Sequence, residues 1–236
     1  TYDRHRLLQW GALNVVMPKV DGVLAVTEQF AEKYKDKTGV KNTGVAGMWI
    51  RPEEWPDTNH RDTELRIISL TNANYPKKVQ PLIDAMPVVE KVLQHTGGYW
   101  HLYGKGTHSN RLEAAAADHA HIDFMGYTND IRPALSDANL MLHLSERDGM
   151  PNAIMEGMAS GLPVVTNDYV SFREFEGPLL ISKDDFRLRL TLRDLSSEPA
   201  KRHDIATRGI DYLQANHRPE AVGKRYEQFL TGLYHS

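Results

Sequence analysis

The chain of 236 residues is long enough for one large or two small domains, and its hydrophobic fraction of 41% can supply a proper core. Its net charge of −3, without a long basic run, argues against a nucleic-acid surface as the main binding site. Cysteine is absent, which excludes disulfides, thiolate metal sites and cysteine nucleophiles. No apolar run is long enough to span a membrane, and a chain that begins at Thr1 is expected to lack its natural N-terminus.

The first fifty residues contain too few elements for an independent domain. Residues 5–17 predict a helix, 21–27 a strand and 28–34 a second helix, while 45–50 fit a further short strand. Because so few elements cannot close a core, residues 1–50 are interpreted as the end of a truncated N-terminal domain. Residues 51–64 are mostly polar and include two prolines, which is typical of a linker.

From Leu65 onward, short apolar runs alternate with helical patterns. The runs are mostly apolar on both faces, as in parallel strands that helices cover on both sides. This alternation predicts an α/β fold with a doubly wound, Rossmann-like parallel sheet over residues 65–216. Trailing helices follow. The last of them belongs to the segment 217–236 and is predicted to begin at Pro219. The predicted strands are residues 65–70, 99–104, 122–126, 139–144, 163–167 and 178–181.

Residues 147–165 predict a loop, a short apolar helix and a strand. Gly149 and Pro151 set the turn, with Pro151 at the first helical position, and Gly161 ends the helix. Because this helix follows a buried strand, its N-terminus is expected at the carboxyl edge of the sheet, where open α/β folds bind ligands. Free backbone N–H groups and the helix dipole favour a phosphate there.

Two carboxylates accompany this helix. Glu156 lies about one and a half turns inside it, and Asp148 lies in the preceding loop. A buried carboxylate is costly unless it is hydrogen-bonded, and a pair of sugar hydroxyls can donate to it. From the residues alone, an equally good interpretation is that Glu156 satisfies neighbouring backbone groups and Asp148 caps the helix.

The stretch from Asp148 to Val165 resembles the E-x7-E region of GT-B glycosyltransferases, and most closely the retaining, family 4-like group that uses nucleotide sugars. Asp148 and Glu156 stand at the two motif positions, with Asp replacing the first Glu. Residues 101–106, "HLYGKG", are similar to the family's strand and Gly-x-Gly turn. The resemblance covers nearly the whole chain. It implies a donor-binding domain over 65–216, and a final helix that packs toward the N-terminal acceptor domain.

The resemblance implies a role for each matching residue. Glu156 would hold the ribose hydroxyls, Asp148 would contact the donor sugar, and Lys78 would stabilise the diphosphate as the glycosidic bond breaks. Asp148 and Lys78 are therefore the predicted catalytic residues. The rest of the predicted nucleotide-sugar site is Asn72, Lys77, Gly104, Gly126, Gly149, Met150, Pro151 and Asn152.

This chain departs from the family pattern in two places. The family commonly has Gly-Arg where this chain has Thr71 and Asn72, so the arginine that clamps the phosphate is absent. Either Asn72 substitutes in part, or Lys77 supplies the second cation, or catalysis is weak. Val170 and Ser171 replace paired glycines of the family.

Other patterns carry less weight. The "GKG" at 104–106 lacks the third glycine of a dinucleotide fingerprint, so an NAD site is discounted. His119 and His121 have metal-ligand chemistry but no evident third ligand nearby. His143 lies on a strand predicted to be buried on both faces, so a neutral core histidine is expected. No metal and no cofactor are predicted, and the absence of Asp-x-Asp suits a fold that handles diphosphate without a bound metal.

The implied activity is transfer of a hexose-type sugar from a nucleoside diphosphate sugar to a hydroxyl acceptor, in glycan or polysaccharide synthesis and with retained configuration. The acceptor would be a glycan, a lipid-linked molecule or a small molecule, and nucleic acid is not an expected partner. The expected location is the cytoplasm. An alternative is peripheral attachment to the inner face of the membrane through the missing N-terminal domain. Two alternatives stay open: a non-catalytic relative that only binds a nucleotide sugar or a partner, and a nucleotide-sugar epimerase on the same fold.

Overall fold

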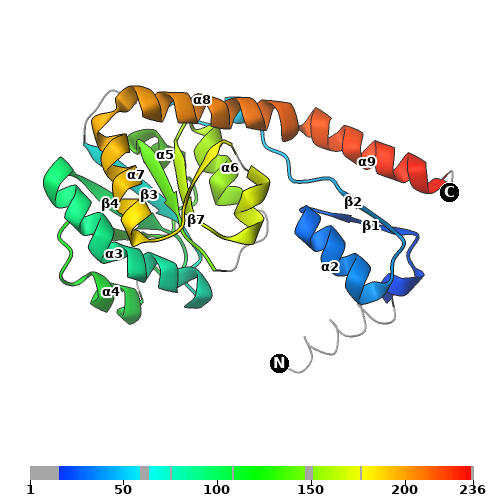
Figure 1. Ribbon diagram of the computed structural model, residues 1–236, viewed down its shortest axis with the longest axis horizontal. Helices are drawn as coiled ribbons and strands as arrows, with labels where there is room; N and C mark the ends of the chain where they lie inside the picture. Colours follow the sequence, from blue (N-terminus) through cyan, green and yellow to red (C-terminus); the bar gives the residue numbers. More distant parts are fainter. Residues whose placement is uncertain are drawn as a thin grey trace. The chain divides into compact units, whose positions relative to one another are not determined.

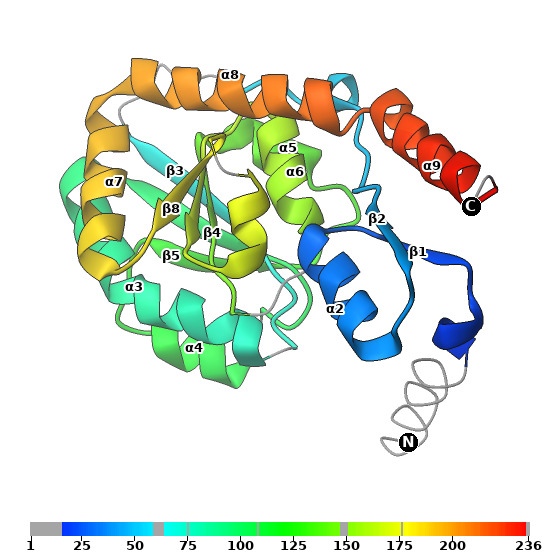
Figure 2. The same ribbon diagram turned by 45° about the vertical axis from the view of Figure 1, so that its right-hand side comes forward.

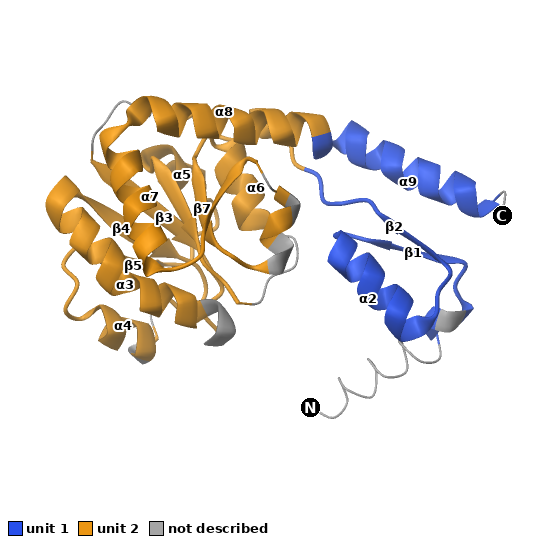
Figure 3. Ribbon diagram, in the orientation of Figure 1, with its two compact units in different colours: residues 1–49, 216–236 blue, residues 50–215 orange. Residues whose placement is uncertain are grey.

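The computed structural model describes residues 16–58, 64–74, 76–107, 109–146, 151–175 and 177–234 (Figure 1). Nearly all of the helix predicted over residues 5–17 lies outside the described residues. The chain divides into two compact units, one made of residues 1–49 and 216–236 and the other of residues 50–215 (Figure 3). Within the described residues, each unit has its own sheet.

The larger unit is built on a parallel sheet of six strands in the order β5-β4-β3-β6-β7-β8. Chain order reverses between β3 and β6, and this reversal is the switch point at which such sheets bind ligands. The predicted doubly wound α/β fold is confirmed. The strands are β3 (Leu65–Leu70), β4 (Gly98–Tyr103), β5 (Ile122–Gly126), β6 (Leu140–His143), β7 (Val164–Asn167) and β8 (Leu179–Ser182).

Helices connect these strands and follow them. The α3 helix continues through Pro81 and Pro87. Its buried apolar residues offset the backbone hydrogen bonds that these prolines cannot make. The α3 and α7 helices pack against each other (Figure 2). The helical segments of this unit are η3 (Pro52–Glu54), α3 (Pro76–Thr96), α4 (Asn110–Ala116), α5 (Arg132–Asp137), α6 (Asn152–Ala159), η4 (Val170–Phe175), α7 (Asp185–Ser197) and α8 (Pro199–Asn216).

A chain of buried hydrogen bonds crosses the centre of the sheet. The indole N–H of Trp100 donates to Ser69 Oγ at 2.8 Å, and the Ser69 hydroxyl donates to the Leu142 carbonyl. Trp100 is 0% exposed and Ser69 is 1% exposed. The polar groups are therefore satisfied inside the core, and the contact joins β4, β3 and β6.

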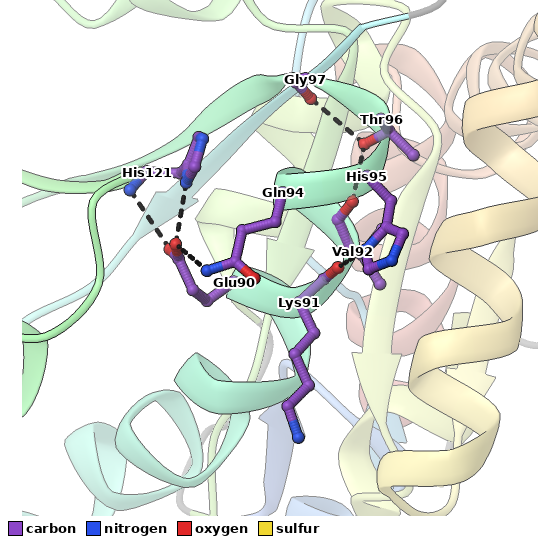
Figure 4. Close-up of polar contacts among 8 residues, drawn as sticks. All are labelled: Glu90, Lys91, Val92, Gln94, His95, Thr96, Gly97 and His121. Atoms are coloured by element: carbon purple, nitrogen blue, oxygen red, sulfur yellow. Dashed lines mark hydrogen bonds and ion pairs between the residues drawn. The ribbon is translucent and has the colours of Figure 1, made fainter.

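A second polar cluster joins α3 to the residue before β5 (Figure 4). Glu90 is 4% exposed, and it accepts from the His121 backbone N–H at 3.2 Å and from Gln94 Nε2 at 3.1 Å, while His121 Nδ1 lies 2.8 Å from its carboxylate. Burial by itself raises the pKa of Glu90, but the hydrogen bonds lower that pKa overall. His121, considered above as a metal ligand, thus has a carboxylate partner. Nowhere in the described ranges do three or more His, Asp or Glu side chains gather to hold a metal ion.

The smaller unit pairs β1 (Gly22–Ala25) with β2 (Asn42–Val45) in parallel, and contains η2 (Met17–Lys19), α2 (Glu28–Thr38) and α9 (Pro219–Tyr234). The strand predicted over 45–50 is wrong, because the chain pairs with β1 directly after α2 and leaves the sheet at Val45. The ring of Phe229 covers Gly44, where a Cβ would lie 2.7 Å from it. Glycine therefore allows α9 to pack closely on this sheet. No helix in the described ranges is both long and apolar enough to cross a membrane.

The buried hydrogen-bond chain generates a stability prediction. Ser69→Ala should lower the free energy of unfolding by about 1–3 kcal/mol, because it leaves the Trp100 indole N–H buried without an acceptor. Urea denaturation measures this cost. In the double variant Ser69→Ala/Trp100→Phe the orphaned donor is gone, so the combined cost should be less than the sum of the two single costs. Strict additivity would contradict the coupling.

Candidate functional site

A cavity of about 510 Å³ opens at the carboxyl edge of the larger sheet. Loops after four strands and the start of α6 form its walls, at the switch point where the strand order places a ligand. The lining residues are Leu70, Thr71 and Asn72 after β3; Gly104 and Lys105 after β4; Tyr127 after β5; His143, Leu144 and Ser145 at the end of β6; and Pro151, Asn152, Ala153 and Glu156 around α6.

Much of the predicted site lies in this cavity. The predicted residues in its walls are Asn72, Gly104, Pro151, Asn152 and Glu156. These residues are up to 84 positions apart in the chain, counting from 72 to 156, and the parallel sheet brings them together.

Five other predicted site residues lie, in whole or in their side chains, outside the described part of the structure. Lys77 and Lys78 belong to the first turn of α3, but their side chains are outside the described part of the structure. Asp148, Gly149 and Met150 lie outside the described residues. Both predicted catalytic residues therefore remain predictions.

The Gly-x-Gly turn after β4 closes the floor of the cavity. The Gly104 N–H donates to the Gly126 carbonyl at 2.8 Å, so these two predicted glycines are in direct contact. Gly104 has φ 139°, and a Cβ on it would lie 1.7 Å from the Thr71 carbonyl oxygen. Only glycine fits at this position, because any side chain would push the loop after β3 away.

The loop that carries Asn72 is held by neighbouring backbone groups. The Asn72 side-chain oxygen accepts from the Asn74 N–H at 3.3 Å, and the Ala73 N–H donates to the Lys105 carbonyl at 2.8 Å. This arrangement presents a neutral amide to the cavity. A cation comes from the neighbouring loop, because Lys105 also lines the cavity.

Sequence reasoning missed Lys105, although its position inside the Gly-x-Gly turn was a usable signal. Its Nζ lies 5.1 Å from the centroid of the Tyr127 ring, another lining residue that was missed. A lysine held against an aromatic face at the rim can meet an anionic ligand.

The α6 helix presents its N-terminus to the cavity. Pro151 is the N-cap residue of α6 and not its first helical residue as expected, because its ψ of 114° is extended. Asn152 and Ala153 follow in the first turn and also line the cavity. Backbone N–H groups of a first turn have no partner within the helix, so they are available to an anion. Gly161, with φ 68°, ends the helix as predicted.

Glu156 is half-buried in the cavity wall. Its neighbours Ile154, Met155 and Met158 are at most 2% exposed, so the helix around it is apolar and packed. Burial raises the pKa of the Glu156 carboxyl, and within the described residues no donor lowers it again. A carboxylate in this position is therefore free to accept from hydroxyl groups of a ligand.

Two residues at the end of β6 shape the rear wall. His143 is 6% exposed and meets the Phe172 ring edge-on at 5.4 Å, which confirms the expected core histidine. His143 also lines the cavity. The sequence, which predicted only that His143 is buried, did not reveal this position in the cavity wall. Ser145 exchanges two hydrogen bonds with the Asn167 side chain, at 2.9 and 3.0 Å, and these bonds fix the start of the loop that leads to residue 148.

Comparison with known families agrees with this geometry. Residues 64–189, more than half of the chain, match the family described as glycosyl transferases group 1. The chain belongs to this family. The matched range contains the whole parallel sheet and every residue that lines the carboxyl-edge cavity.

A viral relative is similar over most of the chain. The protein named "Putative glycosyltransferase ORF31", from a virus (isolate Australia/Victoria), is 39% identical over 210 residues, which cover 88% of this chain and 65% of the relative. The chain thus spans less than two thirds of that relative's length.

Two solved structures share the fold. Staphylococcus aureus TarM, in a complex with UDP, Fondaparinux and alpha-GlcNAc-glycerol, superposes with a TM-score of 0.78 at 17% identity, over 96% of this chain and 46% of that chain. Anabaena Alr3699/HepE, in a complex with UDP and glucose, gives a TM-score of 0.73 at 14% identity, over 90% of this chain and 64% of that chain. These likenesses confirm the predicted GT-B fold.

The Gly104 contact predicts a large effect for a small substitution. Gly104→Ala should lower the free energy of unfolding far more than Gly177→Ala, and should open the cavity floor. Both glycines have positive φ, 139° and 107°, but a Cβ at Gly177 meets nothing within 4 Å. Gly177→Ala therefore reports the conformational cost alone, about 1–2 kcal/mol. Thermal denaturation compares the two, and equal losses would contradict the steric role of Gly104.

The ionised Glu156 carboxylate should lower the free energy of unfolding, although the same charge favours ligand binding. Its folded-state pKa lies above the ordinary 4.5, so stability falls as the pH rises from about 4.5 through the folded-state pKa and then stays level. Glu156→Gln removes this cost and should raise the Tm at neutral pH. Below pH 4.5 the two proteins should converge. Calorimetric melts over pH test this, and a variant that is less stable at neutral pH would contradict it.

Proposed function

We propose that this chain is the donor-binding part of a retaining, family 4-like glycosyltransferase, which transfers a sugar from a nucleoside diphosphate sugar to a hydroxyl acceptor. The observation that carries the proposal is the half-buried Glu156 carboxylate in the cavity wall, with no donor to it among the described residues. An apolar helix tolerates such a carboxylate at a cost, and a ribose that donates two hydroxyls offsets that cost when it binds.

The other parts of the cavity match the remainder of the donor. The diphosphate would lie at the N-terminus of α6, where the first-turn N–H groups of Asn152 and Ala153 are oriented for an anion. Lys78, supported by Lys77, would neutralise the diphosphate, and Asp148 would hold the sugar hydroxyls. Asp148 and Glu156 would then act as the two acidic positions of an E-x7-E motif.

The reaction requires little chemistry from the protein beyond positioning and charge. The bond between the sugar carbon and the phosphate oxygen breaks, and its electron pair leaves with the nucleoside diphosphate. A new bond forms between the same carbon and the acceptor hydroxyl oxygen, whose proton passes to the departing phosphate. Cations around the diphosphate stabilise the charge that develops on it, so no metal or cofactor is needed.

Lys105 is a candidate for the positive charge that Asn72 does not provide. Where the family commonly has a second positive clamp, this chain has a neutral amide, and Lys105 faces the same cavity from the adjacent loop. We infer that Lys105 supplies the missing charge. The alternative is a relative that binds a nucleotide sugar without turnover, and Asn72 is the observation that favours it.

The relatives support a choice of donor. Two structures with this fold were solved with UDP, one of them with glucose, which makes UDP-glucose the first donor to test. The acceptor, a glycan, a lipid-linked molecule or a small molecule, would bind an N-terminal domain of the longer protein, in keeping with a chain that spans 65% of its viral relative. Location in the cytoplasm with peripheral membrane attachment belongs to the same proposal and rests on the resemblance alone.

Nucleotide binding tests the role of Glu156. Titration calorimetry with UDP, GDP and ADP should show binding of at least one nucleotide, and Glu156→Gln should weaken it by about 10- to 100-fold, as expected for loss of a charged hydrogen bond. Glu113→Gln, at an exposed position on α4, is the matched control and should leave the affinity unchanged. Unchanged binding by Glu156→Gln would refute the ribose role.

Turnover separates a transferase from a binding-only relative. In the protein extended by its N-terminal domain, release of UDP from UDP-sugar should fall at least about 100-fold in Lys78→Met and Asp148→Asn, as for loss of transition-state contacts. If Lys105 supplies the second clamp, Lys105→Met should lower both the rate and the affinity for UDP, because UDP carries the diphosphate that this cation contacts. Nucleotide binding with no sugar transfer to any acceptor would favour the binding-only relative.

A further inference from the structure

A second cavity, of about 730 Å³, lies between the C-terminal parts of α3 and α7. Because α3 ends at Thr96 and β4 begins at Gly98, this cavity lies at the amino edge of the sheet, opposite the donor cavity. The six residues of β4 separate the two edges by about 20 Å. A ligand here cannot share contacts with a nucleotide sugar at the carboxyl edge.

The walls of this cavity are positively charged. Lys91 on α3 and Arg189 and Arg193 on α7 are permanent cations, and all three line it. The lining carboxylate, Asp194, pairs with Lys201 at 3.3 Å, and the same ammonium lies 3.9 Å from Glu198. The lining therefore carries three cations against one carboxylate. In the part of the chain that the structure describes, none of the three lining cations is within ion-pair distance of a carboxylate.

These cations are not required to cap the end of α3. Cations gather at helix C-termini because the last carbonyls are unpaired and carry partial negative charge. Here the His95 ring, whose Nδ1 lies 2.6 Å from the oxygen, covers the Lys91 carbonyl, and the Thr96 hydroxyl donates to the Val92 carbonyl at 3.1 Å (Figure 4). The Gly97 N–H also donates to the Leu93 carbonyl, one of the last four of α3, at 2.8 Å. Carbonyls at this helix end therefore have partners other than Lys91.

The end of α7 shows the same pattern. The Ser196 hydroxyl donates to the Arg193 carbonyl at 2.7 Å, and the Ser197 hydroxyl lies 3.1 Å from the carbonyls of both Arg193 and Asp194. The Glu198 N–H also donates to the Asp194 carbonyl at 3.0 Å. The Arg202 guanidinium donates to the Leu195 carbonyl, so groups other than Arg189 and Arg193 meet the carbonyls of this last turn. Arg189 lies over the Phe186 ring, 5.6 Å from its centroid, which leaves its guanidinium N–H groups available to an anion.

We propose that this cavity binds a phosphate-bearing anion. Two guanidinium groups and an ammonium group around one cavity match the oxygens of a phosphoester, because a guanidinium donates two parallel hydrogen bonds and lysine adds a point charge. The volume suits a ligand of sugar-phosphate or headgroup size. The site stands apart from the donor cavity, so it goes beyond the proposed transferase activity and can hold while that proposal fails.

The first test titrates the protein with inorganic pyrophosphate and follows backbone amide NMR shifts. Saturable shifts should appear in residues 91–97 and 189–197, and Lys91→Gln/Arg193→Gln should weaken this binding at least about tenfold, as for loss of two charged contacts. The control Lys41→Gln/Arg187→Gln also removes two positive charges, at exposed positions that do not line the cavity. Arg187 lies on α7, as Arg193 does. Thermal melts of both variants verify that they fold.

A second arm distinguishes a soluble phosphoester from a lipid headgroup. Vesicles of phosphatidylglycerol mixed with phosphatidylcholine are compared with pure phosphatidylcholine vesicles by sedimentation. Binding of pyrophosphate or of the anionic vesicles that is lost in Lys91→Gln/Arg193→Gln and kept in the control supports the site and identifies the source of the phosphate. No binding of either probe, shifts confined to the carboxyl-edge loops, or equal loss in both variants would overturn the proposal.

Discussion

Parallel pairing of the six strands is the constraint on which the rest of this structure depends. Each crossover must return along a face of the sheet, so every strand ends at the same edge and every connecting helix ends at the other. Loops that are distant in the sequence therefore lie side by side at one edge, because the strands that they follow pair with one another. The hydrogen-bonded chain from Trp100 through Ser69 to Leu142 holds the central strands in place, and the carboxyl-edge loops inherit their spacing from these strands.

At the carboxyl edge, backbone geometry determines which side chains can converge. Gly104 allows the loops after β3 and β4 to approach to a distance that no side chain permits. The consequence is chemical, because this approach brings the amide of Asn72 and the cation of Lys105 to one cavity. The neighbouring loop therefore places a positive charge in the cavity that the neutral amide of Asn72 also lines.

The two edges of the sheet differ in how they treat charge. At the carboxyl edge, the N-terminus of α6 and the Glu156 carboxylate, which has no donor among the described residues, face the cavity. This suits a ligand with both a diphosphate and hydroxyl groups. At the amino edge, groups other than the lining cations meet carbonyls near the ends of α3 and α7, and Lys91, Arg189 and Arg193 stay exposed. Glu90 shows the opposite arrangement, since its charge is fully used inside the fold by His121 and Gln94. In the part of the chain that the structure describes, charged groups without an oppositely charged partner thus line both candidate sites.

The sequence by itself determined the strand and helix pattern, the helix limits at Pro219 and Gly161, the glycine turn and the family, because caps, periodicity and motif spacing are local properties. It also singled out Glu156 as a candidate binding residue, because a carboxylate among apolar helix residues can be recognised without knowing the tertiary structure. Only the tertiary structure showed that Lys105, Tyr127 and His143 share the cavity, that β2 ends at Val45, and that cations of α3 and α7 meet about a hundred residues apart in the chain. These outcomes depend on which strands pair and which helix faces pack, and long-range burial decides both.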